Sequence, residues 1–285
     1  MKAYPLLLEG IPFRVHNIIG IYRIKEKIAV LHCAFSFAGE EQSAEDKRKP
    51  NYILLDLFSE DFEEHSKTHL CFYEQGFVSA LDSELYEEKG KFILNTKAYK
   101  GFAPTIAKLI EVFDTSLAEI GLPPMPIARI YNDRKIYPFG DVEVYMHSPF
   151  MMACRNSCSG EIIWKTKIGA YLYTEVKAEN GILYFGTDGN GGKFWAVNLL
   201  DGSTVYNYNS RGTSNFLFYR DYVLLSNEKN KPILLHRKDG SLVKALEFGD
   251  YEITVYQHMI IVKDRLYAIA SKKDTVYAVC TDLPL

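Results

Sequence analysis

The chain has 285 residues, 47% of them hydrophobic and 24% charged, which is typical of a globular protein long enough to bury a large core. Its formal net charge of −3 provides no general attraction to nucleic acid or to anionic membranes, so neither is expected as a partner. No run approaches the ~18 apolar residues that a membrane-spanning helix needs, and the 14% aromatic content favours β-structure.

The chain start and the cysteines predict a cytoplasmic protein. The apolar run at residues 6–8 is interrupted by Glu9, Gly10 and Pro12, and no small-residue cleavage site follows it, which is untypical of a signal peptide. Five cysteines, mostly within apolar runs, are typical of reduced core thiols rather than a disulfide framework. A chain whose signal peptide had been removed would look the same, and a periplasmic location would then apply.

The first half of the chain predicts strands at 18–24 and 28–34, joined by a charged turn, and a third strand at 52–58. A polar loop at 39–51 precedes that third strand, so these elements form one blade-like unit. The region 66–103 is less regular, and we expect a degenerate second unit there with a strand near 92–94.

Residues 104–120 depart from the β pattern and predict an inserted α-helix. Apolar residues recur there at steps of three and four, which places them on one helical face. Gly121 stands where a helix-ending glycine belongs, and two prolines follow it. The polar face carries Lys108, Glu111, Asp114 and Glu119. The helix is expected either to pack on the side of the domain or to form a partner-binding surface.

The second half of the chain repeats a pattern in which a tight polar turn precedes an apolar strand. Such strands are predicted at 136–139, 182–185, 222–225 and 266–270, and further strands follow at 150–154, 194–199, 233–236 and 276–280. The last copy stops after its third strand. We therefore predict that the chain start, near residues 4–15, supplies the missing outer strand and brings the two termini together.

These units together predict an all-β fold, a single β-propeller domain over residues 1–285. About six four-stranded blades are expected, with five or seven as alternatives, in an architecture shared with WD40-type proteins.

A short phrase recurs three times, at 159–164, 201–206 and 239–243, and each copy contains a glycine: Gly160, Gly202 and Gly240. The glycines are 42 (202 − 160) and 38 (240 − 202) residues apart, which is the period of a four-stranded propeller blade. The Asn-type residue four positions before the glycine, such as Asn198, is expected to cap the turn. The glycine supplies a positive φ, and an aromatic residue four positions later, Trp164 or Tyr206, packs between neighbouring blades.

The phrases at 160–164 and 196–206 resemble the PQQ-like (quinoprotein-type) propeller repeat, Ala-x-Asp-x-x-x-Gly-x-x-x-Trp, and the resemblance extends over residues 145–285. The family includes PQQ-dependent dehydrogenases, which resemble one another in an eight-bladed disc of about twice this length and in a pair of adjacent cysteines beside the cofactor. This chain has no such pair and is too short. It is therefore identified as a member that binds no PQQ, and no cofactor is expected.

Three other motifs are interpreted as structural. His65, His69 and Cys71 would align two histidines on one helical turn, but no fourth metal ligand is visible. Cys154 and Cys158 lack the second cysteine pair of a zinc site. The glycine-rich stretch 188–193 joins two predicted strands and lacks the ending of a phosphate-binding loop, which indicates a hairpin tip. No catalytic, cofactor-binding or metal-binding residue is assigned.

Several polar and aromatic residues fall near predicted blade ends, where loops carry binding groups on a rigid scaffold. They are Arg155, Arg211, Tyr171, Tyr173 and the stretch 250–252, and each is interpreted individually as a solvated loop residue.

The function expected from the sequence is that of a non-catalytic scaffold that binds another protein, and an immunity- or inhibitor-type protein would fit. The alternative is an enzyme or small-ligand-binding protein that uses the central channel of the propeller. A third reading, a periplasmic assembly factor, depends on a longer natural chain start. The sequence predicts neither the identity of a partner nor the oligomeric state.

Overall fold

The structure is a computed structural model of the whole chain, and its described residues are 1–8, 11–12, 18–34, 52–72, 77–78, 80, 83–100, 103–113, 117–121, 135–188, 191–213, 215–225, 231–253, 258–273 and 275–284. The predicted loop at 39–51 and the predicted site residue Asp114 lie outside them.

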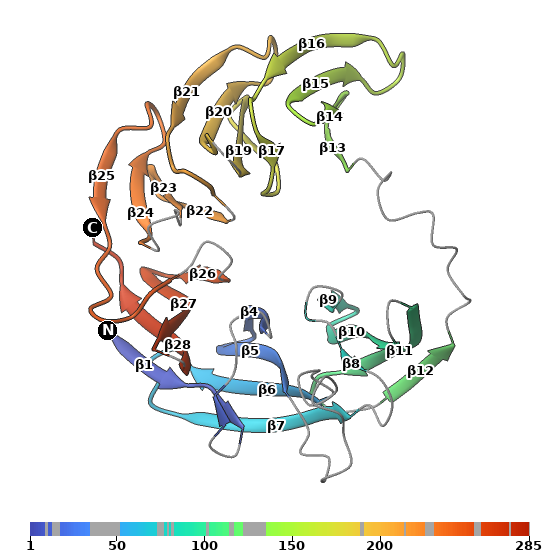
Figure 1. Cartoon of the computed structure of the whole chain (residues 1–285), viewed down its shortest axis with the longest axis vertical. Coiled ribbons are helices and arrows are strands. Elements are labelled where there is room, and N and C mark those ends of the chain that lie inside the picture. Colours follow the sequence, from blue (N-terminus) through green and yellow to red (C-terminus); the bar gives the residue numbers. More distant parts are fainter. Residues whose placement is uncertain are drawn as a thin grey trace. The chain divides into compact units, whose positions relative to one another are not determined.

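Strands make up all the regular elements in the described part of the chain, in agreement with the predicted all-β class. Most of the strands lie in antiparallel sheets of four or five members (Figure 1). Within these residues no helix is long and apolar enough to cross a bilayer. The chain divides into two compact units: unit 1 contains residues 1–127 and 258–285, and unit 2 contains residues 128–257.

The first sheet of unit 1 is a simple four-stranded meander, in which neighbours in sequence are also neighbours in space. Its strands are β4 (Ile18–Ile24), β5 (Lys27–Ala34), β6 (Tyr52–Ser59) and β7 (His65–Phe72). The three strands predicted here are confirmed to within one residue at each end. Lys25, in the turn between β4 and β5, has a φ of 56°, as tight two-residue hairpins require.

The second sheet of unit 1 overturns the predicted helix. It contains β8 (Phe77–Val78), β9 (Glu84–Glu88), β10 (Lys91–Lys100), β11 (Ala103–Glu111) and β12 (Leu117–Gly121). Strands β11 and β12 occupy the stretch expected to be helical, and they pair with each other in antiparallel register.

The apolar spacing was misleading because β11 is covered on both faces. Ala107 and Ile110 are both buried although they point to opposite faces of the strand. A strand buried on both faces loses its alternation of apolar and polar residues, so steps of three and four arise by coincidence.

The last sheet of unit 1 joins the two ends of the chain. It consists of β26 (Met259–Val262), β27 (Arg265–Lys272), β28 (Thr275–Asp282) and, as its outer strand, β1 (Lys2–Pro5). Lys2 lies opposite Cys280 and Pro5 opposite Tyr277. The prediction that the chain start completes the last sheet is therefore confirmed, and a short hairpin of β2 (Leu7–Leu8) and β3 (Ile11–Pro12) follows β1.

Unit 2 contains three successive sheets of the same type. The first has β13 (Ile136–Phe139), β14 (Val142–Ser148), β15 (Met151–Asn156) and β16 (Ile162–Lys167). The second has β17 (Tyr171–Leu172), β18 (Lys177–Glu179), β19 (Ile182–Asp188), β20 (Phe194–Asn198) and β21 (Thr204–Tyr208). The third has β22 (Phe216–Tyr219), β23 (Tyr222–Leu225), β24 (Ile233–His236) and β25 (Leu242–Ala245).

The sheets of each unit pack face to face, so the central strands are buried on both sides. In β19, Leu183 and Phe185 pack toward the preceding sheet, against Trp164 among others, whereas Tyr184 packs toward Phe216 and Val223 of the following sheet. Unit 1 follows the same rule, because β4 to β7 contribute Val30 and Leu54 to one core and Leu31 and Leu55 to another. Two-sided packing of four-stranded meanders is the packing of propeller blades.

Candidate functional site

The three glycine phrases form equivalent hairpins between the third and fourth strands of the sheets in unit 2. Gly160, Gly202 and Gly240 have φ values of 73°, 71° and 71°, which only glycine adopts without strain. Each glycine N–H donates to the carbonyl four residues earlier, at 3.0, 2.9 and 2.8 Å respectively. Asn198 caps its turn as predicted, since its side-chain oxygen accepts the Leu200 N–H at 2.9 Å.

The aromatic residues of the first two phrases contact the hairpin of the next sheet. Trp164 lies against Gly202, where an added Cβ would come within 2.6 Å of the indole, and its Nε1–H donates to the Leu199 carbonyl at 2.8 Å. Tyr206 covers Gly240 in the same way. The repeat residues therefore hold neighbouring sheets together and are a structural device rather than a binding site.

A buried ionic network lies inside unit 1, in the sheet of β4 to β7. The carboxylate of Asp56, which is fully buried, lies 2.5 Å from His32 Nε2 through one oxygen and 2.5 Å from His65 Nε2 through the other. Lys67 Nζ is 3.6 Å from the same carboxylate. The rings of Tyr4 and Phe58 lie 4.1 and 4.8 Å from that of His65.

Burial and hydrogen bonding set the charges in this network. Burial raises the pKa of Asp56, but the hydrogen bonds from His32 and His65 and the charge of Lys67 outweigh it, so the pKa is held below its ordinary value. Burial lowers the pKa of His32, despite its hydrogen bond to Asp56. The network is thus a buried carboxylate that accepts N–H hydrogen bonds from two histidines, one of which packs against the Tyr4 ring. It links strands β5, β6 and β7 inside unit 1.

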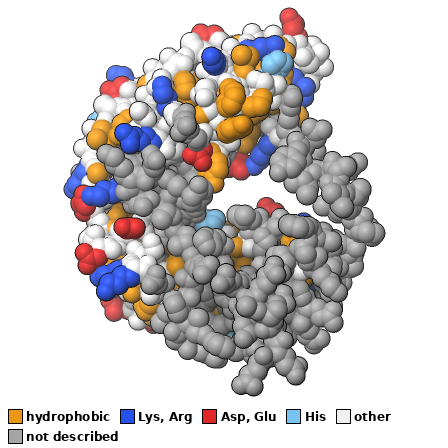
Figure 2. All heavy atoms as spheres, viewed as in Figure 1, with side chains coloured by type: hydrophobic (Ala, Val, Ile, Leu, Met, Phe, Trp, Pro, Cys, Tyr) orange, Lys and Arg blue, Asp and Glu red, His pale blue; other side chains and the backbone are white. Residues whose placement is uncertain are grey.

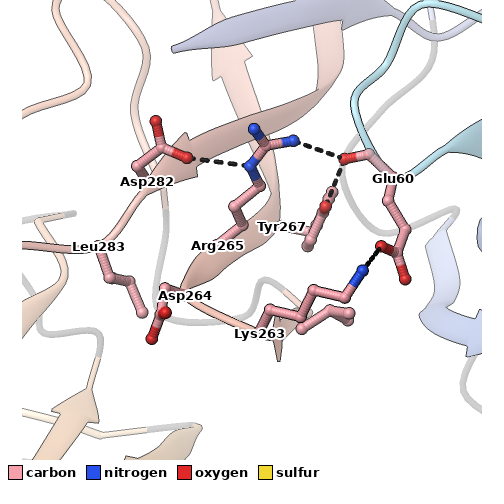
Figure 3. A pocket seen from close by; sticks show the side chains of 8 residues that line it. Glu60, Lys263, Asp264, Arg265, Tyr267, Asp282 and Leu283 are labelled. Atoms are coloured by element: carbon pink, nitrogen blue, oxygen red, sulfur yellow. Dashed lines mark hydrogen bonds and ion pairs between the residues drawn. The ribbon is translucent and has the colours of Figure 1, made fainter.

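A charged cavity of about 470 Å³ opens at one end of the last sheet of unit 1 (Figure 3). Arg265 donates to Asp282 at 2.9 Å and to the Glu60 carbonyl at 3.3 Å. Lys263 forms an ion pair with the Glu60 carboxylate, which Arg23 also contacts at 2.9 Å. The hydrogen bond from Lys263, with that from Arg23, lowers the pKa of Glu60.

This cavity is best explained as a junction between two sheets. Glu60 follows β6, whereas Arg265 and Tyr267 belong to β27, and the Tyr267 hydroxyl donates to the Glu60 carbonyl. Arg265 and Lys263 already pair with carboxylates, so a charged ligand would have to displace those pairs.

A different kind of surface lies on unit 2, where exposed aromatic side chains gather at one end of the first two sheets. We define the aromatic patch as Phe150, Tyr171 and Tyr173, which are 43%, 59% and 44% exposed. The rings of Phe150 and Tyr171 are 5.1 Å apart and inclined by 58°. Figure 2 shows hydrophobic side chains gathered on the viewed face of unit 2, over the sheet of β19 and β20.

Backbone hydrogen bonds fix the turns that carry the aromatic patch. The N–H of Ile168 donates to the Phe150 carbonyl at 2.9 Å, which joins the turn after β14 to the end of β16. The N–H of Tyr173 donates to the Gly186 carbonyl at 3.0 Å, and Tyr171 lies opposite Asp188 in β19. A rigid cluster of large, exposed, amphipathic side chains is typical of a protein-binding surface.

Of the four residues predicted to bind a partner through a helix, the three that the structure describes lie in strands. Lys108 lies in β11 and is only 8% exposed, Glu111 ends the same strand, and Glu119 lies in β12 opposite Lys108. Their role in partner binding remains a prediction, but the helical surface that motivated it is not formed.

The structure does not bring the histidines and cysteines of the other sequence motifs together into one site. His65 and His69 lie on strand β7 rather than on a helical turn: His65 contacts Asp56, while His69 packs against Tyr52 with their rings 6.0 Å apart. None of the five cysteines forms a disulfide. Burial raises the pKa of the Cys71 thiol to about 12 and also raises that of Cys154, which makes both poor nucleophiles. No group of three or more His, Cys, Asp or Glu in the described ranges is arranged to hold a metal ion.

Sequence reasoning treated Tyr171 and Tyr173 as single loop residues and did not single out Phe150 or the Asp56 network. The network had a signal, since Asp56 and His32 are polar residues within otherwise apolar strands. The patch had none, because the Phe150 turn is joined to the segment before Tyr171 by backbone hydrogen bonds, such as that from the Ile168 N–H to the Phe150 carbonyl.

Comparisons with known proteins do not identify the chain. No family model matches it, and no curated protein matches it. Among solved structures, Saccharomyces cerevisiae Sqt1 is similar at 11% identity with a TM-score of 0.43, over 94% of this chain and 72% of that one. The AfRom2 CNH domain is similar at 10% identity with a TM-score of 0.43, over 94% and 95% of the two chains. The computationally designed Ika8 protein has 10% identity and a TM-score of 0.38, over 93% and 96%.

Proposed function

We propose that this chain is a non-catalytic β-propeller scaffold of about six blades that binds another protein through the aromatic patch. The propeller is supported by the succession of four-stranded meanders, by their two-sided packing, and by the outer strand β1 that the chain start supplies. The PQQ-like repeat is supported by the contacts of Trp164 and Tyr206 with the glycine hairpins of the next sheets.

The observation that carries the binding function is the contact between the exposed rings of Phe150 and Tyr171, with a further exposed ring, Tyr173, two residues along the chain. Single exposed apolar residues are common on soluble proteins, but a cluster of aromatic rings is not. Tyr and Phe combine a large apolar surface with few rotatable bonds, so ordering them in a complex costs little entropy. A cytoplasmic immunity- or inhibitor-type protein is one scaffold of this class.

The test is quantitative capture of proteins from lysate of the source cells, by the wild-type chain and by the double variant Phe150→Ser/Tyr171→Ser. We expect the wild type to retain a stoichiometric partner and the double variant to lose it. Leu200→Ser is the matched control, because Leu200 is also on unit 2, is 80% exposed and lies outside the patch. Equal recovery of the same partner by the wild type and the double variant would overturn the proposal.

A further inference from the structure

The aromatic patch is surrounded by basic side chains, which bears on the chemistry of its partner. The two turns that carry the patch, residues 146–151 and 165–173, contain Lys165, Lys167 and His147 but no Asp or Glu. Both lysines are exposed, and Lys167 lies opposite Met151, next to Phe150. Alternation along β16 places Lys165 and Lys167 on the same face of the strand.

Among the residues that the structure describes, no carboxylate compensates the charge of Lys165. Its Nζ lies 3.0 Å from His147 Nε2, so an imidazole rather than an acid orients the side chain. An ammonium held in place without an anionic partner is available to a carboxylate on another molecule.

The neighbouring loops of the second sheet add further cations. Lys193 precedes β20, its ammonium lies 5.4 Å from the centre of the Trp195 ring, and Arg211 is exposed in the loop after β21. These loops meet at the end of the sheet that carries Tyr171, because Thr213 donates its N–H to the Thr187 carbonyl at 3.3 Å.

Two acids border the patch. Glu175, two residues after Tyr173, forms an ion pair with Lys135. Asp188 lies opposite Tyr171, but its Oδ1 points toward Gly212, where an added Cβ would come within 2.9 Å of it. The surface formed by the patch and its flanks therefore combines aromatic rings with an excess of positive charge, although the chain as a whole carries a net charge of −3.

We propose that the aromatic patch, with Lys165, Lys167, Lys193 and Arg211 around it, binds an acidic, extended segment of the partner protein that contains apolar or aromatic residues. This inference rests on the proposed function and specifies its partner. Carboxylates of the segment pair with the lysines, and its apolar side chains contact Phe150 and Tyr171.

Aromatic rings and cations are also found where single-stranded nucleic acid binds. Two observations favour the acidic peptide. The Phe150 and Tyr171 rings are inclined by 58° rather than presented as parallel platforms for successive bases. The negative net charge of the chain also opposes a long polyanion more than it opposes a short acidic segment.

The test is fluorescence anisotropy with the full-length chain and three labelled probes of similar length: a Glu/Tyr copolymer peptide, a Lys/Tyr copolymer peptide and oligo-dT. We expect binding of the Glu/Tyr peptide, weakening as salt is added, and none of the Lys/Tyr peptide. The double variant Lys165→Glu/Lys167→Glu should bind the Glu/Tyr peptide about tenfold more weakly or not at all, because two attractive charges become repulsive.

Lys238→Glu/Lys244→Glu is the matched control, since both residues are exposed on unit 2 outside the patch and the change in net charge is identical. Its affinity should equal that of the wild type, and circular dichroism should show all variants folded. Equal affinities of the two double variants, or tighter binding of oligo-dT than of the Glu/Tyr peptide, would overturn the inference. If the Glu/Tyr peptide does not bind while lysate capture still depends on Phe150 and Tyr171, the acidic partner is wrong and the proposed function stands.

Discussion

Tyr206 occupies the position in its repeat that Trp164 holds in the preceding one, but it reproduces only half of the contact. Both rings cover the glycine of the next hairpin. The indole N–H of Trp164 also reaches a carbonyl, that of Leu199, whereas the buried hydroxyl of Tyr206 has no hydrogen-bond partner within the described part of the chain. An unsatisfied buried hydroxyl costs about 1–3 kcal/mol.

We therefore predict that Tyr206→Trp raises the free energy of unfolding by about 1 kcal/mol, because the introduced indole N–H can donate to the Arg237 carbonyl, the equivalent of that of Leu199. The measurement is urea denaturation followed by circular dichroism. Tyr206→Phe serves as the control: it removes the unsatisfied hydroxyl without adding a donor, and its stability should equal or slightly exceed that of the wild type. A loss of more than about 1 kcal/mol in Tyr206→Phe would show that the hydroxyl is satisfied.

At the scale of elements, the N-terminal segment contributes far more than its length suggests. Besides pairing with β28, it places the fully buried Leu6 in the core and the Tyr4 ring over His65 and Phe58. The Leu6 N–H donates to the Val276 carbonyl at 2.8 Å. Burial of one leucine side chain stabilises a fold by about 2–3 kcal/mol, and the strand pairing adds to this.

Deletion of residues 1–8 should therefore lower the free energy of unfolding by more than about 3 kcal/mol and expose β28 as an edge that promotes aggregation. Thermal unfolding and light scattering measure the two effects. A synthetic peptide with the sequence of residues 1–8 should restore part of the lost stability when added to the truncated chain, and a scrambled peptide should not. A truncated chain that melts at the wild-type temperature would contradict the role of β1.

At the scale of the whole molecule, we predict that stability falls in two steps as the pH is lowered. Burial holds the pKa of His32 below its ordinary 6.5, so below that pH the unfolded chain binds a proton that the folded chain does not, and stability declines. Asp56 and Glu60 have pKa values held below their ordinary 3.8 and 4.5, so their contribution is present above those values and is lost as the pH falls through the folded pKa values.

Thermal denaturation between pH 8 and pH 3 tests this prediction. The melting temperature should be constant above about pH 7, decline gradually below it, and fall further below about pH 4.5. His32→Gln, which cannot titrate in this range, should reduce the upper step and retain the lower one; part of the upper step remains because burial also lowers the pKa of His258. A melting temperature that rises between pH 7 and pH 5 would contradict the sign of the His32 effect.

The sequence by itself determined the all-β class, the supply of the last outer strand by the chain start, and six strands of unit 2, namely β13, β15, β19, β20, β23 and β24. These features depend on local properties: the glycines with positive φ, the polar turns and the apolar runs recur with a fixed period, so each copy supports the others. The incomplete final repeat was equally informative, because a sheet edge left open needs a partner strand.

Only the tertiary structure decided the features that depend on contacts between distant segments. Strands β11 and β12 replaced the expected helix because packing on both faces of β11 overrides the local spacing of its apolar residues. The Asp56 network needed three strands to bring two histidines to one carboxylate. The aromatic patch brings together Phe150 and Tyr171, which are separated in the sequence by strands β15 and β16. Their contact depends on backbone hydrogen bonds that no sequence periodicity encodes.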